Sequence, residues 1–136
     1  MGTNADIVRS LYGEDGRRWD PATLDDFQQR FWHPEITWHA IEGALDDVGL
    51  MEGRERVRRY YDEWLEVYDD LTVERTHLEE IGGRVVAGVC VHGRSSSGAI
   101  PETHLNFAIV FELRDGQVLS GREYATLDEA LDAARA

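Results

Sequence analysis

The pattern of apolar and polar positions changes character midway along the chain. Up to Asp70, apolar residues recur at three- to four-residue spacing, which predicts helices, and from Leu71 they alternate with polar residues, which predicts strands. Helices followed by a run of strands predict one α+β domain over residues 1–136, with its helices segregated to one face of a mainly antiparallel sheet. The predicted elements are helices after Asn4, from the Thr23/Asp26 cap, over Arg54–Asp70 and from the Thr126/Glu129 cap, and strands over Ile36–Ile41, Leu71–Ile81, Arg84–Gly93 and Thr103–Tyr124.

A hairpin centred on Asp115-Gly116 is the strongest local signal, because this dipeptide tolerates the positive φ angles of a type I′ turn. With these two residues as the loop, Glu123 lies opposite Ala108. Side chains alternate between the two faces of a strand, so this register defines two sets of residues. One face carries His104, Asn106, Ala108, Gly121 and Glu123, and the other carries Leu105, Phe107, Ile109 and Phe111.

The mixed face has the composition of a cavity wall, whereas the apolar face is a candidate dimer interface. The helix over Arg54–Asp70 must pack on the sheet, because its aromatic residues Tyr60, Tyr61, Trp64 and Tyr68 keep to one side. Residues 42–53 combine glycines and aspartates with apolar side chains, so they either form a flap over a pocket or pack on the core.

Charge and composition exclude several classes of partner. The net charge is −13 and the chain has no lysine, which argues against nucleic acid and against an anionic membrane surface. No apolar run approaches the ~20 residues that span a bilayer, and residues 1–10 lack a hydrophobic signal region. We therefore expect a cytoplasmic protein without membrane contact.

Cysteine and histidine spacing predicts neither a disulfide nor a metal site. Cys90 is the single cysteine, and its position among valines is typical of a small buried apolar residue. The five histidines show no i, i+4 or His-x-His pairing, and bulges prevent the assignment of His92 to a face. Ser95 to Ser97 lack the context of a nucleophile. We expect no metal and no cofactor.

Several landmarks in order resemble the SnoaL-like family of the nuclear transport factor 2-like superfamily. They are the segments His33–Trp38, Gly53–Tyr61, Arg84–Val86, Phe111–Val118, Arg122–Tyr124 and Ala130-Leu131. The resemblance implies a cone-shaped α+β barrel, commonly dimeric, in which three to four helices and a strongly curved sheet enclose a ligand cavity. It does not imply one activity, since the fold hosts cyclases, isomerases, epoxide hydrolases, dehydratases and non-catalytic binders.

The same resemblance implies which residues line the cavity. Positions that correspond to Gly121, Glu123 and Ala125 face the pocket in relatives similar to ketosteroid isomerase, and a working glutamate of other relatives maps to Glu123. Alanines stand at the positions of the two isomerase carboxylates, Ala40 and Ala108 in our alignment. Steroid isomerisation is therefore not expected.

Glu123 is the residue that we expect to carry chemistry. An apolar cavity would raise the pKa of its carboxyl above the ~4.3 of a free glutamate and make it a general acid or base near neutral pH. The alternative is a structural carboxylate paired with an arginine. Asn106 and His104 are its expected catalytic partners. His104 lies about 13 Å along the strand and would meet Glu123 only across a bound molecule.

Two functions remain open from the sequence. The first is a cofactor-independent isomerase, cyclase or dehydratase that uses Glu123 on a small apolar or aromatic metabolite. The second is a non-catalytic ligand-binding or dimerisation module of the same fold, and in both cases we expect a homodimer through the sheet. The residues expected to bind the substrate are Tyr12, Trp38, Tyr60, Trp64, Ala108 and Gly121.

Overall fold

The computed structural model describes residues 4–12, 17–41, 50–95 and 103–136. Within them, the strands form a seven-stranded sheet in the order β1-β4-β5-β6-β7-β2-β3. The elements are α1 (Asn4–Leu11), β1 (Arg17–Arg18), α2 (Pro21–Arg30), β2 (Trp32–His39), β3 (Leu50–Glu52), α3 (Arg54–Val67), β4 (Tyr68–Ile81), β5 (Arg84–Ser95), β6 (Thr103–Arg114), β7 (Gln117–Tyr124) and α4 (Leu127–Arg135).

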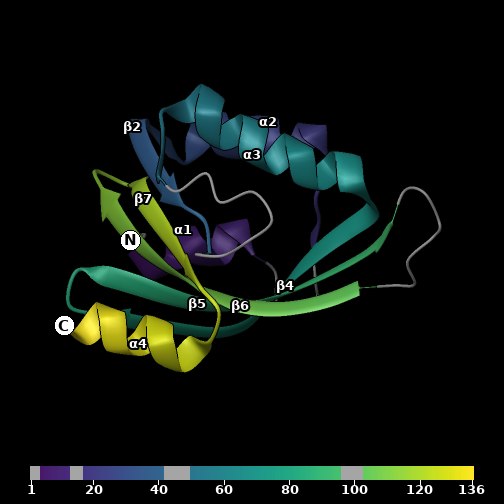
Figure 1. Cartoon of the computed structure of the whole chain (residues 1–136). Coiled ribbons are helices and arrows are strands. Elements are labelled where there is room, and N and C mark those ends of the chain that lie inside the picture. The colour runs from purple at the N-terminus through teal and green to yellow at the C-terminus, as the bar shows by residue number, and fades with distance from the viewer. Residues whose placement is uncertain (1–3, 13–16, 42–49, 96–102) are drawn as a thin grey trace.

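The sheet is a curved meander with one parallel addition. Strands β4 to β7 pair antiparallel in chain order, as their alternating pattern predicted. Strand β2 then pairs in parallel with β7, so Trp38 lies beside Gly121. The result is the predicted α+β fold, with long curved strands and helices packed on them (Figure 1).

Helices cover both faces of the sheet, although the sequence predicted one face only. Helices α2 and α3 lie on one side, and α4 lies on the opposite side against β5 and β6 (Figure 1). We call these the inner and the outer face. Helix α4 packs Ala130 and Ala134 on Val86, Ala108 and Val110 in a cluster separate from the main core. Alanines on both the helix and the sheet allow α4 to pack closely on the outer face. Helix periodicity alone does not show which face of a sheet a helix covers.

Capping residues set the helix boundaries. The Asp20 side chain accepts a hydrogen bond from the backbone N–H of Thr23, and Pro21 opens α2. This helix therefore begins earlier than its Thr23 cap predicted, because Asp20 followed by proline is the better start. The Thr126 cap of α4 is confirmed, since its hydroxyl accepts from the N–H of Glu129.

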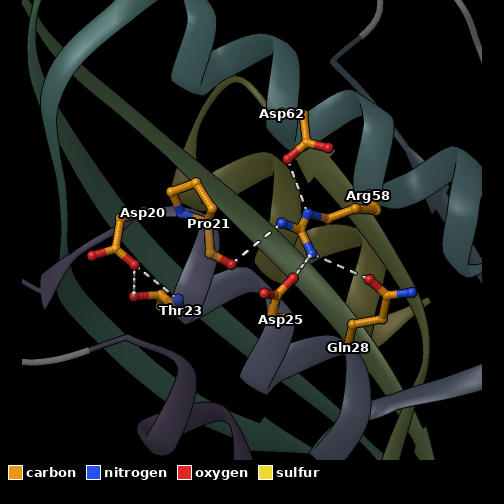
Figure 2. A network of polar contacts seen from close by, with 7 residues as sticks. All are labelled: Asp20, Pro21, Thr23, Asp25, Gln28, Arg58 and Asp62. Atoms are coloured by element: carbon orange, nitrogen blue, oxygen red, sulfur yellow. Dashed lines mark hydrogen bonds and ion pairs between the residues drawn. The ribbon is translucent and has the colours of Figure 1, made fainter.

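A guanidinium joins the two helices above the inner face. Arg58 of α3 donates to the carboxylates of Asp25 in α2, at 2.6 Å, and of Asp62, at 2.9 Å. It also reaches the side chain of Gln28 and the carbonyl of Pro21 (Figure 2). Only 16% of its side chain is exposed, so this contact fixes α2 against α3 from a partly buried position.

A β-bulge changes the predicted hairpin register. The turn is as expected, because Asp115 and Gly116 both have positive φ and Arg114 pairs with Gln117. Leu113 then pairs with Val118, but Glu112 pairs with Ser120. Leu119 is the additional residue, and such a residue moves every later side chain on its strand to the other face relative to the partner.

The bulge places Glu123 opposite Ile109, so the predicted pairing with Ala108 is wrong. Phe107, Ile109 and Phe111 consequently share the inner face with Glu123 and belong to the main core or pack against it. The prediction of a dimer interface on these residues is therefore also wrong, because the chain buries them against its own helices. A homodimer through the sheet stays a prediction, which light scattering tests against the 15.5 kDa monomer.

The connection from residue 42 to 53 is described only in part. Residues 42–49, on which the flap prediction depends, lie outside the described residues. Leu50–Glu52 forms β3 on the edge of the sheet and buries Met51, which agrees with packing on the core. In the described part of the chain, every helix is too short or too polar to cross a bilayer.

Candidate functional site

Glu123 of β7 is enclosed by hydrogen-bond donors. It is 6% exposed, and no other charged residue in the described part of the chain is as deeply buried. Trp38 Nε1 donates to Oε2 at 2.8 Å, and the Tyr60 hydroxyl lies 3.0 Å from both carboxylate oxygens. The backbone N–H of Ile41 also donates to this carboxylate. Among the described residues these donors are uncharged, so the alternative of an arginine-paired Glu123 is wrong.

The environment of Glu123 favours its neutral form. Burial raises the pKa of its carboxyl above the ordinary 4.5. Hydrogen bonds from Trp38, Tyr60 and Ile41, and the proximity of His39, lower the same pKa and offset part of this effect. The predicted burial and the predicted direction of the shift are confirmed, whereas a catalytic role stays a prediction.

Three tyrosines surround the carboxyl and stay protonated. Burial, and then the negative charge of Glu123, raise the pKa of Tyr12 and of Tyr60 well above the ordinary range. Burial also raises the pKa of Tyr61, which shares a hydrogen bond with Tyr12. A phenol that keeps its proton is a hydrogen-bond donor at every physiological pH. Among these groups, Glu123 is therefore the one that can change its protonation state, and its neighbours are donors of fixed protonation.

A small cavity lies between the helices and the inner face of the sheet. Its volume is about 20 Å³, which is room for about one water molecule. Trp64 and Phe107 are the partly exposed members of its lining, and their rings lie 6.4 Å apart. The cavity is lined by Tyr12, Trp19, Tyr61, Trp64, Leu71, Val73, Val89, Phe107, Ile109 and Glu123.

Trp19 is a cavity residue that sequence reasoning missed. Its ring stacks on Tyr12 at 5.6 Å and meets Tyr61 edge-on at 5.3 Å. Its Nε1 is buried without a hydrogen-bond partner among the described residues. A buried donor without an acceptor costs about 1–3 kcal/mol. The available signal was a tryptophan placed between Gly16 and Pro21 in the sequence.

Four of the predicted substrate-binding residues lie at this site. Tyr12 and Trp64 line the cavity, whereas Trp38 and Tyr60 bind Glu123. Gly121 lies beneath the ring of Trp38, where any Cβ would overlap that ring. Gly121 thus allows the indole to reach Glu123. Contact of these residues with a ligand stays a prediction.

The remaining predicted residues lie on the outer face. Ala108 is fully buried under α4, and His104 and Asn106 continue the same face of β6 as exposed residues. The structure therefore does not bring His104 or Asn106 together with Glu123, and the Leu119 bulge is the reason. Ala108 also does not occupy the isomerase position, because Ile109 is the inner-face neighbour of Glu123.

The arrangement can exchange a proton between one carboxyl and a molecule in an aromatic cavity. Glu123 is the only ionisable carboxyl among the described lining residues, so the site lacks the pair of carboxylates that two-step acid/base chemistry often uses. One carboxylate also offers too few ligands to hold a metal ion firmly.

The fold and this site define a class: cone-shaped α+β proteins with a cavity between helices and a curved sheet. A family model described as SnoaL-like domain matches residues 8–120. The chain therefore belongs to the SnoaL-like family, as its landmarks predicted. No curated protein sequence matches the chain.

Solved structures with the same fold cover nearly the whole chain. A proposed SnoaL-like polyketide cyclase from Jannaschia sp. CCS1 is 20% identical, with a TM-score of 0.72 over 98% of this chain and 92% of that one. A nuclear transport factor 2-like protein of unknown function from Burkholderia pseudomallei is 17% identical, with a TM-score of 0.72 and 100% of both chains covered. TerC, co-crystallised with polyporic acid, is 16% identical, with a TM-score of 0.69 and 98% of both chains covered. At these identities the likeness shows the fold alone.

Proposed function

We propose that this chain binds a small aromatic ketone or hydroxyquinone in the inner cavity and that Glu123 moves a proton on it without a cofactor. The observation that carries the proposal is a buried carboxyl, with its pKa raised by burial, in a cavity that is otherwise lined by aromatic and aliphatic side chains. A carboxyl in such surroundings keeps its proton to a higher pH than an exposed glutamate does, which suits it to proton transfer.

The donors around the cavity support a role for each neighbour. Trp19 Nε1 would donate to a ligand carbonyl, which satisfies its missing hydrogen bond. Glu123 would remove a proton from the carbon beside that carbonyl, and the negative charge would pass to the carbonyl oxygen. The same proton, returned to another carbon, gives isomerisation. Attack of the enolate carbon on a second carbonyl carbon gives cyclisation, and Glu123 then returns the proton to the new alkoxide oxygen.

Tyr60 and Trp38 would hold the carboxylate in place during this exchange. Their hydrogen bonds stabilise the charged form of Glu123, so they allow it to act as a base despite its burial. The likeness to the proposed polyketide cyclase and to TerC with its bound polyporic acid supports the choice of ligand class.

The cavity volume favours a second function, a binding module without turnover. About 20 Å³ accommodates no metabolite unless side chains move, and both oxygens of Glu123 already accept hydrogen bonds. Under either function a ligand would enter by displacing Trp64 and Phe107, the partly exposed pair of the lining.

Two probes test binding and chemistry separately. Polyporic acid, titrated against the tryptophan fluorescence, tests binding. Trp19→Phe should weaken it about tenfold, equivalent to about 1.4 kcal/mol for one lost hydrogen bond. Trp32→Phe removes a buried indole outside the lining of this cavity and should leave binding unchanged. Equal affinities for the two variants would remove Trp19 from the site.

1-Tetralone in D₂O tests the chemistry. The wild type should accelerate deuterium incorporation at the carbon beside the carbonyl, as followed by NMR, and Glu123→Gln should return the rate to that of buffer. Binding of both probes without accelerated exchange would establish the binding module instead. If neither probe binds, both functions are wrong.

A further inference from the structure

A second group of reactive side chains lies on the outer face of the sheet, beyond the part that α4 covers. Cys90 and His92 on β5 and His104 on β6 present one ligand atom each, and these atoms all lie within 4.8 Å of one another. Cys90 is buried, His92 is half-buried and His104 is exposed. The group therefore reaches from the sheet surface to solvent.

The strand pairing brings these residues together. Cys90 and His92 are two positions apart, so they point to the same face. His104 is the direct partner of His92 across the β5–β6 ladder, and their rings lie 4.4 Å apart at 84°. Two rigid paired strands hold all three donors, which is the kind of support that precise metal sites need.

We propose that Cys90, His92 and His104 bind one divalent transition-metal ion, with zinc as the expected occupant. One thiolate and two imidazoles are ligands that zinc prefers. At usual zinc bond lengths, neighbouring ligand atoms of a tetrahedral site lie about 3.4–3.7 Å apart. The ligand atoms, which lie within 4.8 Å of one another, must therefore approach by about 1.4 Å at most, and rotation of the exposed His104 ring can supply part of this movement.

Glu74 completes the group as a positioning residue. It is the partner of Cys90 on β4, and its Oε2 lies 3.4 Å from Nε2 of His92. Histidines that bind metals usually donate their other ring N–H to a carboxylate, which fixes the orientation of the ring. Glu74 would hold His92 in this way, and a water molecule would take the fourth position on the metal.

Zinc binding at this group would displace the proton of the Cys90 thiol, because the thiolate is the form that binds the metal. The group is on the opposite face from Glu123, so the metal site does not depend on the proposed function.

Zinc titration of the untagged full chain tests the site. Competition with a chromophoric chelator should give one zinc per chain. Cobalt in place of zinc should give the charge-transfer absorption of a cobalt–thiolate bond. Cys90→Ser should abolish that absorption and weaken zinc binding about 100-fold or more, because loss of an outer-shell partner alone costs about 10- to 100-fold.

A matched pair of histidine substitutions distinguishes zinc binding at this site from zinc binding by surface carboxylates. His104→Gln should weaken binding as strongly as Cys90→Ser, and because His104 is exposed this substitution should leave the core intact. His77→Gln changes a half-buried histidine on β4 outside the group and should leave binding intact. Absence of zinc binding, or binding that survives both Cys90→Ser and His104→Gln, would overturn the proposal.

Discussion

Replacement of Glu123 by glutamine should change how stability depends on pH. The wild-type carboxyl has a higher pKa in the folded chain than the ordinary 4.5, because burial disfavours its charge. Between those two values the folded state binds more protons at this site than the unfolded state does. The contribution of Glu123 to stability therefore falls as the pH rises through this window. This contribution is constant below the unfolded-state pKa and above the folded-state pKa of the carboxyl.

The magnitude follows from linkage. Well inside the window, one proton is bound in the folded state and released on unfolding, so the free energy of unfolding falls by about 1.4 kcal/mol per pH unit. Glutamine has nearly the same shape and does not titrate. The wild type should therefore lose stability relative to Glu123→Gln from about pH 4.5 upwards, at no more than this slope.

Urea unfolding at a series of pH values measures this difference. Fluorescence of the buried tryptophans reports unfolding, and subtraction of the two curves cancels the titration of the remaining acidic groups. Glu35→Gln, on an exposed residue of β2, is the control and should follow the wild type. A difference between wild type and Glu123→Gln that stays flat, or that grows in favour of the wild type with pH, would refute the reasoning.

Two further substitutions test the packing that positions the site. Gly121→Ala should destabilise the chain by about 1–3 kcal/mol, because the added methyl group overlaps the Trp38 ring. Gly83→Ala, where the added methyl group meets open space, is the control. Equal melting temperatures of the two variants in thermal unfolding would contradict the contact between Gly121 and Trp38. Arg58→Ala should cost about 1.5–3 kcal/mol in urea unfolding because it removes hydrogen bonds to carboxylates from a mostly buried guanidinium. Arg30→Ala breaks an exposed pair within α2 and should cost no more than about 0.5 kcal/mol; a similar loss in both variants would show that the contact between the helices contributes little.

Local signals in the sequence predicted the elements of the inner site well. The aromatic stripe of α3 faces the sheet, and the Asp115-Gly116 turn and the Thr126 cap are where their residue types require them. The family resemblance also selected Glu123. The predicted hairpin register placed this residue on the mixed face, so its apolar surroundings became visible only in the structure.

Only the tertiary structure showed which residues surround Glu123. The Leu119 bulge moves Ile109, rather than Ala108, beside Glu123, and a bulge of this kind has no distinct sequence signature here. Trp19 reaches the cavity from a short segment before α2, which carried no periodicity.

The sequence by itself determined the order of helices and strands and the position of the tight turn, because these depend on neighbouring residues. Only the tertiary structure decided which side chains meet. His92 and His104 become direct neighbours through the β5–β6 register, although twelve positions separate them along the chain and no spacing rule links them. Strand pairing depends on packing across the whole sheet. A shift of one residue in the register therefore moves the side chains of a strand to the opposite face.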